Sequence, residues 1–189
     1  MFGLFGKSKG TIKNPKVLIA SVGSVGSSLI AEDREIYESY FSEIETYHAD
    51  NLSAFYQFLQ GRTFDVLHLF ASVDSNHTIE NESGLRFFEH LSRTNVKLFV
   101  LANNNEADNL LPFFSQSKSA GVAPMNLVMT LDRKGKRFSS FFKSVLGHMI
   151  EGKTMPQAWV KVAPQNPNIQ HETPETIFSA GYGSLKFVP

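Results

Sequence analysis

The chain contains no cysteine. Without sulfur nucleophiles it can form no disulfide bond, no thiolate metal site and no cysteine acyl-enzyme. It also lacks an excess of either charge, because 18 basic and 18 acidic residues cancel. A balanced charge creates no field that would attract nucleic acid or an anionic membrane. Neither is therefore expected as the main partner.

Long hydrophobic runs are absent too, since no stretch approaches the roughly 18 apolar residues that cross a bilayer. The start, "MFGLFGKSKG", places an apolar cluster before Lys7 and Lys9, the reverse of the order in a secretory signal. Residues 1–15 are interpreted as a flexible N-terminal tail, with a weak membrane or partner anchor as the alternative. Residues 16–189 are expected to form one cytoplasmic domain, whose core contains many of the 17 phenylalanines.

Strand-like and helix-like patterns alternate along the chain. Short apolar runs predict strands at residues 16–22, 44–49, 64–73, 96–102, 126–131 and 176–188. Amphipathic patterns predict helices at residues 31–44, 51–62, 84–93, 108–121, 136–152 and 155–163, with a kink or restart at Pro112 and a stop at Gly121. This alternation predicts an α/β fold with a mainly parallel sheet of about six strands between helices on both faces.

Open sheets of this kind bind ligands beyond the carboxyl ends of their strands, so the polar segments there compete as sites. They are "GSVGSS" (23–28), "SVDSNH" (72–77), "NNNEAD" (103–108) and "DRKGKR" (132–137). The first could hold a phosphate through backbone amides at Gly23, Ser24, Gly26 and Ser27. It lacks the P-loop lysine and the dinucleotide fingerprint, and a tight turn needs glycine in any case. A plain turn is the favoured interpretation.

The other titratable residues favour structural roles. His68 lies in the middle of an apolar strand and is interpreted as a core histidine with satisfied hydrogen bonds. His77, Glu80 and Glu82 could be arranged as metal ligands, but nothing fixes their geometry and a solvated loop is favoured. The "DRKGKR" segment is interpreted as a solvated turn, with an anion or an acidic partner as the alternative. No metal and no cofactor is expected.

Two predicted strands, read together, resemble a known family. "FDVLHLFASVD" and "VKLFVLANNNEAD" are similar to the strands that carry the catalytic histidine and cysteine of the CHAT domain, a bacterial branch of the caspase-like (clan CD) protease fold. Asp65, Val66, Leu67 and His68 match the start of the first motif, and residues 98–102 match the approach to the second.

The C-terminal region extends this resemblance to nearly everything from Lys16 to Pro189. "FSSFFKSVLGHMIEGKTMPQAWVKVA" resembles the family's helix pair, and "FSAGYGSLKFVP" its closing strand. The helix-pair positions are occupied by Phe138, Phe142, Leu146, Gly152, Ala158 and Ala163. The resemblance implies a three-layer α/β/α caspase-like domain with the closing strand at or near one edge of the sheet.

The departures from the family pattern fall on its chemistry. Ser72 and Val73 stand where the catalytic histidine and its following glycine are expected. Asn104 stands at the cysteine position, and a shift of one residue would place Asn103 or Asn105 there. Neither serine nor asparagine can supply the thiolate and the base of a cysteine protease. The resemblance therefore implies an inactive pseudo-protease that acts as a protein-binding or signalling module in a bacterial regulatory or defence system.

The polar floor of that degenerate site would consist of Ser72, Asp74 and residues 103–105, which supply hydrogen-bond donors and acceptors. If the alignment holds, the Ser72 and Asn104 side chains lie close together at the ends of adjacent strands. The plainer alternative is that the asparagines only cap the following helix. Two other functions remain open, a receiver-like or nucleotide- and phosphate-binding α/β module that uses "GSVGSS", and an enzyme of another class.

Overall fold

The structure is a computed structural model that describes residues 10–24, 28–119, 125–131, 133, 137–163 and 174–189. Gly26 and Ser27 of the predicted phosphate turn lie outside the described residues, as does Gly121, the predicted stop of a helix. None of the described helices is long and apolar enough to span a membrane.

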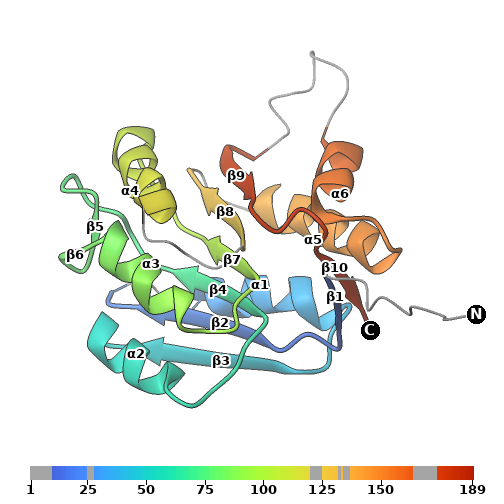
Figure 1. Ribbon diagram of the computed structural model, residues 1–189, viewed down its shortest axis with the longest axis horizontal. Coiled ribbons are helices and arrows are strands. Elements are labelled where there is room, and N and C mark those ends of the chain that lie inside the picture. The colour runs from blue at the N-terminus through green and yellow to red at the C-terminus, as the bar shows by residue number, and fades with distance from the viewer. Residues whose placement is uncertain (1–9, 25–27, 120–124, 132, 134–136, 164–173) are drawn as a thin grey trace, which may run out of the picture.

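A six-stranded sheet forms the centre of the fold, with the strand order β3-β2-β4-β7-β8-β9 (Figure 1). The strands are β2 (Val17–Val22), β3 (Ile44–Ala49), β4 (Val66–Phe70), β7 (Leu98–Leu101), β8 (Asn126–Thr130) and β9 (Thr176–Ala180). All neighbouring pairs are parallel except β8 and β9, which are antiparallel. The predicted mainly parallel sheet of about six strands is confirmed, and β9 at its edge belongs to the predicted closing strand.

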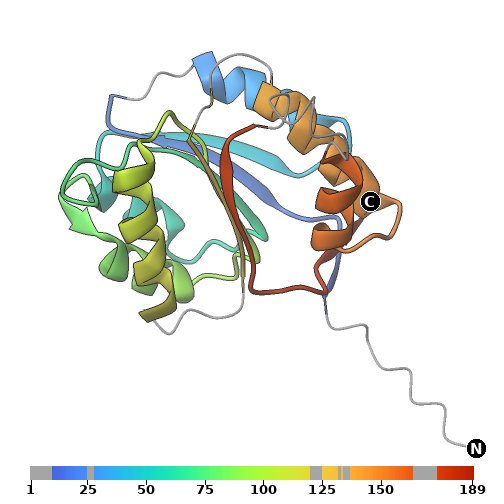
Figure 2. The same ribbon diagram turned by 90° about the horizontal axis from the view of Figure 1, so that it is seen from above.

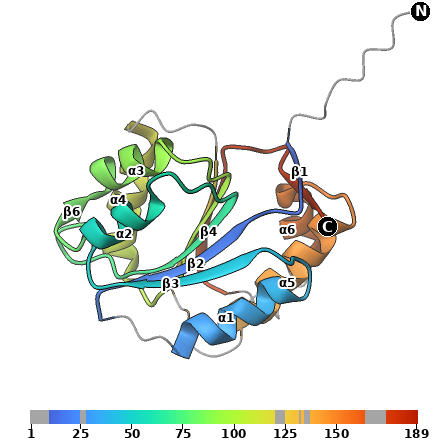
Figure 3. The ribbon, with the colours of Figure 1, turned by 90° about the horizontal axis from the view of Figure 1, so that it is seen from below.

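Helices cover both faces of this sheet (Figures 2 and 3). They are α1 (Ser28–Glu38), α2 (Leu52–Leu59), α3 (Gly84–Ser92), α4 (Ala107–Ser119), α5 (Arg137–Ile150) and α6 (Met155–Val162). Helices α2, α3 and α4 pack on one face, and α1, α5 and α6 on the other. Successive side chains of β4 alternate between the two faces, so Leu67 and Leu69 contact the first layer while Val66 and Phe70 contact the second.

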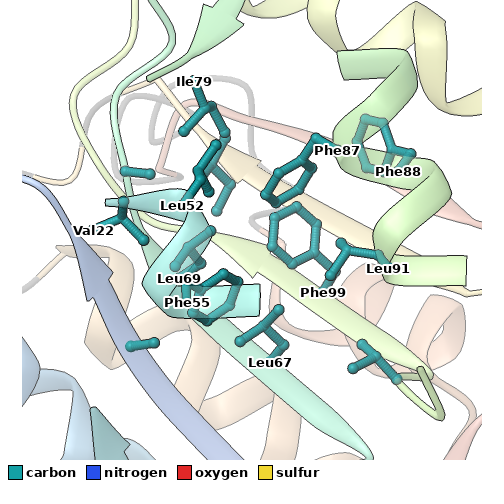
Figure 4. Close-up of a cluster of buried hydrophobic side chains, with 14 of the residues drawn as sticks. Val22, Leu52, Phe55, Leu67, Leu69, Ile79, Phe87, Phe88, Leu91 and Phe99 are labelled. Carbon is teal, nitrogen blue, oxygen red and sulfur yellow. The ribbon is translucent and has the colours of Figure 1, made fainter. Parts of the chain in front are cut away.

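Phenylalanines fill the core on both faces. On the α3 side, Phe87 and Phe88 pack against Phe99 and Phe113, with ring centroids 5.3–6.2 Å apart (Figure 4). On the α5 side, Phe138 and Phe142 stack at 5.3 Å and are fully buried. The amphipathic patterns that predict these helices therefore coincide with the buried faces.

Two predictions about the ends of the domain were wrong. Thr11–Lys13, assigned from the sequence to a flexible tail, form strand β1 and pair in parallel with β10 (Lys186–Val188). The predicted single strand at 176–188 is divided into β9 and β10, which belong to different sheets. The division follows the turn at residues 181–184, which redirects the chain so that β10 can satisfy the backbone of β1.

Local signals at two helices had different outcomes. Asn51 caps α2 as predicted, because its Oδ1 accepts the Ala54 N–H at 2.9 Å. Helix α4 passes through Pro112 as one element and does not restart there. Proline lacks an N–H and so removes only the bond to the carbonyl of Asp108, four residues earlier, which the rest of the helix tolerates.

Candidate functional site at the carboxyl ends of the strands

The segments that follow β4 and β7 meet beyond the carboxyl ends of these two strands. The two strands are neighbours in register, with Leu69 opposite Leu101. Beyond them, Nδ2 of Asn103 donates a hydrogen bond to Oγ of Ser72 at 2.5 Å. The sequence predicts that Ser72 and Asn104 are the residues that approach each other. The two segments do come together, but the side chain that contacts Ser72 is that of Asn103.

The three consecutive asparagines connect the ends of three strands. Oδ1 of Asn104 accepts the N–H of Arg133, beyond β8, at 2.8 Å. Oδ1 of Asn105 accepts the N–H of Val73, beyond β4, at 3.0 Å, and its Nδ2 donates to the carbonyl of Thr130 at 3.1 Å. The asparagines therefore hold the ends of β4, β7 and β8 in fixed positions.

Helix capping does not explain these residues. Among the described residues, none of the N–H groups that the three side chains accept belongs to α4, the helix that follows. Asn105 is also 6% exposed, so its amide replaces water for two backbone groups that would otherwise be buried without partners. The interpretation that the asparagines only cap the next helix is therefore wrong.

Thr130, which the sequence interpretation did not single out, completes this arrangement. Its Oγ1 accepts the N–H of Asn103 at 2.9 Å and lies 2.5 Å from the Asn103 carbonyl, to which it can donate. The side chain is fully buried. A threonine that directly follows the apolar run Leu127–Met129 was the available sequence signal.

Asp74 shapes its own loop. Its carboxylate accepts the N–H groups of Asn76 and Thr78 and the hydroxyl of Thr78, at 2.8–3.0 Å. The bond from the Thr78 backbone contributes most to holding the pKa of Asp74 below its ordinary value. The loop leads into a hairpin made of β5 (Thr78–Ile79) and β6 (Glu82–Ser83). Asp74 therefore organises this hairpin.

The hairpin also lies against the predicted phosphate turn. Gly23 has φ +69°, and a Cβ atom there would collide with the carboxylate of Glu80. Ser24, Ser72, Ile79 and Glu80 line a cavity of only about 70 Å³. A carboxylate beside the Gly23 backbone repels a phosphate, and the cavity is far smaller than typical ligand sites of about 300–1,000 Å³.

A second cluster consists of buried polar side chains of α1 and β4. His68 is fully buried, with Nδ1 2.8 Å from the hydroxyl of Tyr37. Its Nε2 lies 2.9 Å from Oδ2 of Asp33 but does not meet the geometry of a hydrogen bond. Both nitrogens thus face polar groups of α1. The predicted core position of His68 is confirmed, but among the described residues only Nδ1 has a hydrogen-bond partner.

Arg133 joins this cluster to the asparagines. Its guanidinium is 1% exposed and pairs with Asp33 through two nitrogens, with the Nε–Oδ2 distance at 3.1 Å. Burial alone raises the pKa of Asp33, but its contacts with His68 and Arg133 together hold this pKa below the ordinary value. The sequence analysis interprets "DRKGKR" (132–137) as a solvated turn. That prediction is wrong for Arg133, the one position between 132 and 136 that the structure describes.

One nucleophile–base pair escaped the sequence analysis. Oγ of Ser21 lies 2.8 Å from Nδ1 of His48, and Nε2 of His48 lies 4.0 Å from Asp50. Ser21 is fully buried, so a substrate has no access to its hydroxyl. The pair serves as a hydrogen bond between β2 and β3, whose register places the two residues opposite each other. Strand register was not available from the sequence.

The described residues hold no group of three or more His, Asp or Glu side chains positioned to bind a metal ion. Glu82, proposed as one possible ligand, accepts a hydrogen bond from the hydroxyl of Tyr56. His77 and Glu80 have positive φ values of 61° and 51°. They lie in the loop and the hairpin turn that the sequence analysis interprets as a solvated loop.

Comparison with known proteins assigns no family. No protein-family model matches the chain, and no curated protein matches it significantly. Among solved structures, the chain is similar to the RcsB response regulator of Salmonella typhimurium, described in connection with DNA interaction. That likeness has a TM-score of 0.45 and 15% identity, and covers 94% of this chain and 74% of the other.

Proposed function

We propose that this protein is a catalytically inactive caspase-like domain that binds a protein partner in a signalling or regulatory system. The observation that carries the proposal is the bond between Asn103 and Ser72. It joins the two strand ends at which the CHAT-domain resemblance expects the cysteine and the histidine. The residues at these positions satisfy each other and cannot form a thiolate–imidazole pair.

The arrangement of the sheet supports the same proposal. The resemblance implies a mainly parallel sheet of about six strands whose closing strand lies at or near one edge. The sheet has this form, with β9 at the edge beside β8. Helices on both faces supply the α/β/α layers that the resemblance also implies.

A receiver-like or phosphate-binding module is the second candidate, and the strand order favours it. The first five strands of the sheet in chain order, β2, β3, β4, β7 and β8, have the spatial order 2-1-3-4-5 of flavodoxin-like domains, which include receivers. Ligands of such folds bind where the order reverses, between β2 and β4. In this chain Ile79 and Glu80 occupy that position, against Ser24 and Ser72.

Cleavage and binding, measured on the same purified protein, test the first proposal. We expect no turnover of a peptide panel with Lys, Arg or Asp at the cleavage position, and no labelling by thiol-directed inhibitors. We also expect recovery of binding peptides from a displayed random library. Turnover that survives repurification and disappears in Asn104→Ala would make Asn104 part of a working enzyme and would overturn the proposal.

A thermal-shift titration separates the two candidates. A ligand that binds the native state raises the melting temperature by mass action. A receiver-like or nucleotide-binding module should respond to Mg²⁺ or ATP at millimolar concentration, whereas an inactive caspase-like domain should not. The variant Glu80→Gln removes the carboxylate beside Gly23 and serves as a control, because it should bind phosphate better if the turn is a phosphate site.

A further inference from the structure

Two exposed hydrogen-bond donors remain at the ends of β4 and β7 after the internal hydrogen bonds are assigned. Oδ1 of Asn104 accepts the Arg133 N–H, so the amide group of Asn104 has Nδ2 left to donate. Oγ of Ser72 accepts from Asn103, so the hydroxyl hydrogen of Ser72 also remains to donate. Both residues are exposed, and neither donor has a partner among the residues that the structure describes.

The orientation of these amides follows from chemistry. A backbone N–H can only donate, so the atom of each asparagine that receives one must be the oxygen. This identifies Oδ1 of Asn103, Asn104 and Asn105 through the N–H groups of Asn104, Arg133 and Val73. Asn103 and Asn105 then use both of their amide atoms internally. A molecule that approaches this edge therefore meets the donors of Ser72 and Asn104.

The two donors follow neighbouring strands. Leu69 and Leu101 are register partners, and Ser72 and Asn104 each follow their partner by three residues. Oδ1 of Asn104 is bonded beyond β8, on the other side of β7 from Ser72, so the two donors suit carbonyl oxygens of different residues in one segment. A carboxylate is the poorer fit, because Glu80 lines the same small cavity as Ser72 and would repel it.

We propose that Ser72 and Asn104 bind main-chain carbonyl oxygens of an extended segment in the partner protein. An extended segment is the fitting occupant because its carbonyls are not already used within a helix or a sheet. The inference rests on the proposed protein-binding function and specifies which chemical group the site recognises. It assigns Asp74, Asn103 and Asn105 to the framework that holds the two donors in place.

The substitution Asn104→Asp gives the sharpest test. Aspartate has the size of asparagine and keeps an oxygen for the Arg133 N–H, but it replaces the outward donor with an acceptor. Asn95→Asp is the matched control, because Asn95 is exposed in the loop before β7, at the opposite end of that strand. Ser72→Ala removes the second donor.

The probes are peptides selected on the unaltered protein from a displayed random library, with dissociation constants measured by fluorescence polarisation. Asn104→Asp should weaken binding at least about tenfold, and Ser72→Ala about three- to tenfold, as the loss of one hydrogen bond predicts. Asn95→Asp should leave binding unchanged. A peptide in which one ester replaces an amide has a weaker carbonyl acceptor. When the ester stands at the carbonyl that Asn104 recognises, the peptide should bind the unaltered protein more weakly than the all-amide peptide. In Asn104→Asp the same ester should reduce the affinity little further.

The possible failures are distinguishable. Recovery of no peptide overturns the proposed binding function and this inference with it. Peptides that bind Asn104→Asp as tightly as Asn95→Asp would leave the binding function standing and overturn the inference. Loss of binding when acidic side chains of the peptide are neutralised, without any effect of ester substitution, would show recognition of a carboxylate and also overturn it. The ester experiment uses the unaltered protein, so it remains decisive if Asn104→Asp is unstable.

Discussion

Replacing Arg133 with methionine should lower the free energy of unfolding by about 3–5 kcal/mol, because it leaves a buried carboxylate without its guanidinium partner. Asp33 is fully buried and Arg133 is 1% exposed, so water screens neither of them. After the substitution, His68 remains beside Asp33, with Nε2 2.9 Å from Oδ2. Methionine fills much of the volume of the arginine stem, which limits the contribution of lost packing.

Urea unfolding followed by tryptophan fluorescence measures this effect. The single tryptophan, Trp159, stacks on Phe178 at 4.5 Å and reports the loss of that contact. With a slope of about 2 kcal/mol per molar urea, the midpoint should fall by about 2 M. Lys16→Met is the control, because it breaks an exposed ion pair with Glu43 and should cost less than about 1 kcal/mol.

A double-mutant cycle shows whether the charge pair causes the loss. Asp33→Asn combined with Arg133→Met removes both charges, so its cost should be smaller than the sum of the single costs by about 1–3 kcal/mol. If Arg133→Met lowers the free energy of unfolding no more than Lys16→Met does, the buried charge of Arg133 does not stabilise Asp33 as inferred from their geometry. Additive single effects would likewise refute the pairing of Asp33 with Arg133.

Three further predictions concern the same edge of the sheet. The folded-state pKa of Asp33 is depressed, so the contribution of Asp33 to stability is present above about pH 4 and is lost as the pH falls through the folded-state pKa. The variant Asp33→Asn should therefore show a shallower acid denaturation profile than the unaltered protein. Asn105→Ala should cost about 1–3 kcal/mol in urea unfolding, because it leaves buried backbone groups unpaired, and Asn104→Ala should cost less because Asn104 is exposed. Gly23→Ala should lower the melting temperature more than Gly61→Ala, because both have positive φ but only Gly23 also meets a neighbouring side chain; equal losses would contradict this.

Elements with a local periodic signal could be predicted from the sequence. The strand expected at residues 44–49 has the same limits in the structure as β3, and the phenylalanine pattern of α5 lies on its buried face. Strand β1 could not be found in this way, because three residues carry too little pattern and its partner lies at the other end of the chain. The same reason applies to Arg133, whose guanidinium pairs with a carboxylate 100 positions earlier.

The candidate site was predictable as a region but not as a set of contacts. Parallel strands place their carboxyl ends on the same side of a sheet, so the segments after β4 and β7 were expected on that side, and their contact follows from the adjacency of the two strands. Which asparagine contacts Ser72 depends on side-chain directions in an irregular turn, where no periodicity applies. The polar residues of α1 did carry a signal, because Asp33 shares the inward face of this helix with Ile36 and Tyr37.

The proposed loss of catalysis gives the hydrogen bonds at the ends of β4, β7 and β8 a purely structural role. An active dyad needs a nucleophile and a base that are exposed to the substrate and only partly satisfied by the protein, which costs stability. In this chain Asn103 donates to Ser72, and Asn105 satisfies the backbone of Val73 and Thr130. Groups that catalysis would leave open are thus used to hold three strand ends together. Under the proposed function, the exposed donors of Ser72 and Asn104 are the part of this region that remains for a partner to contact.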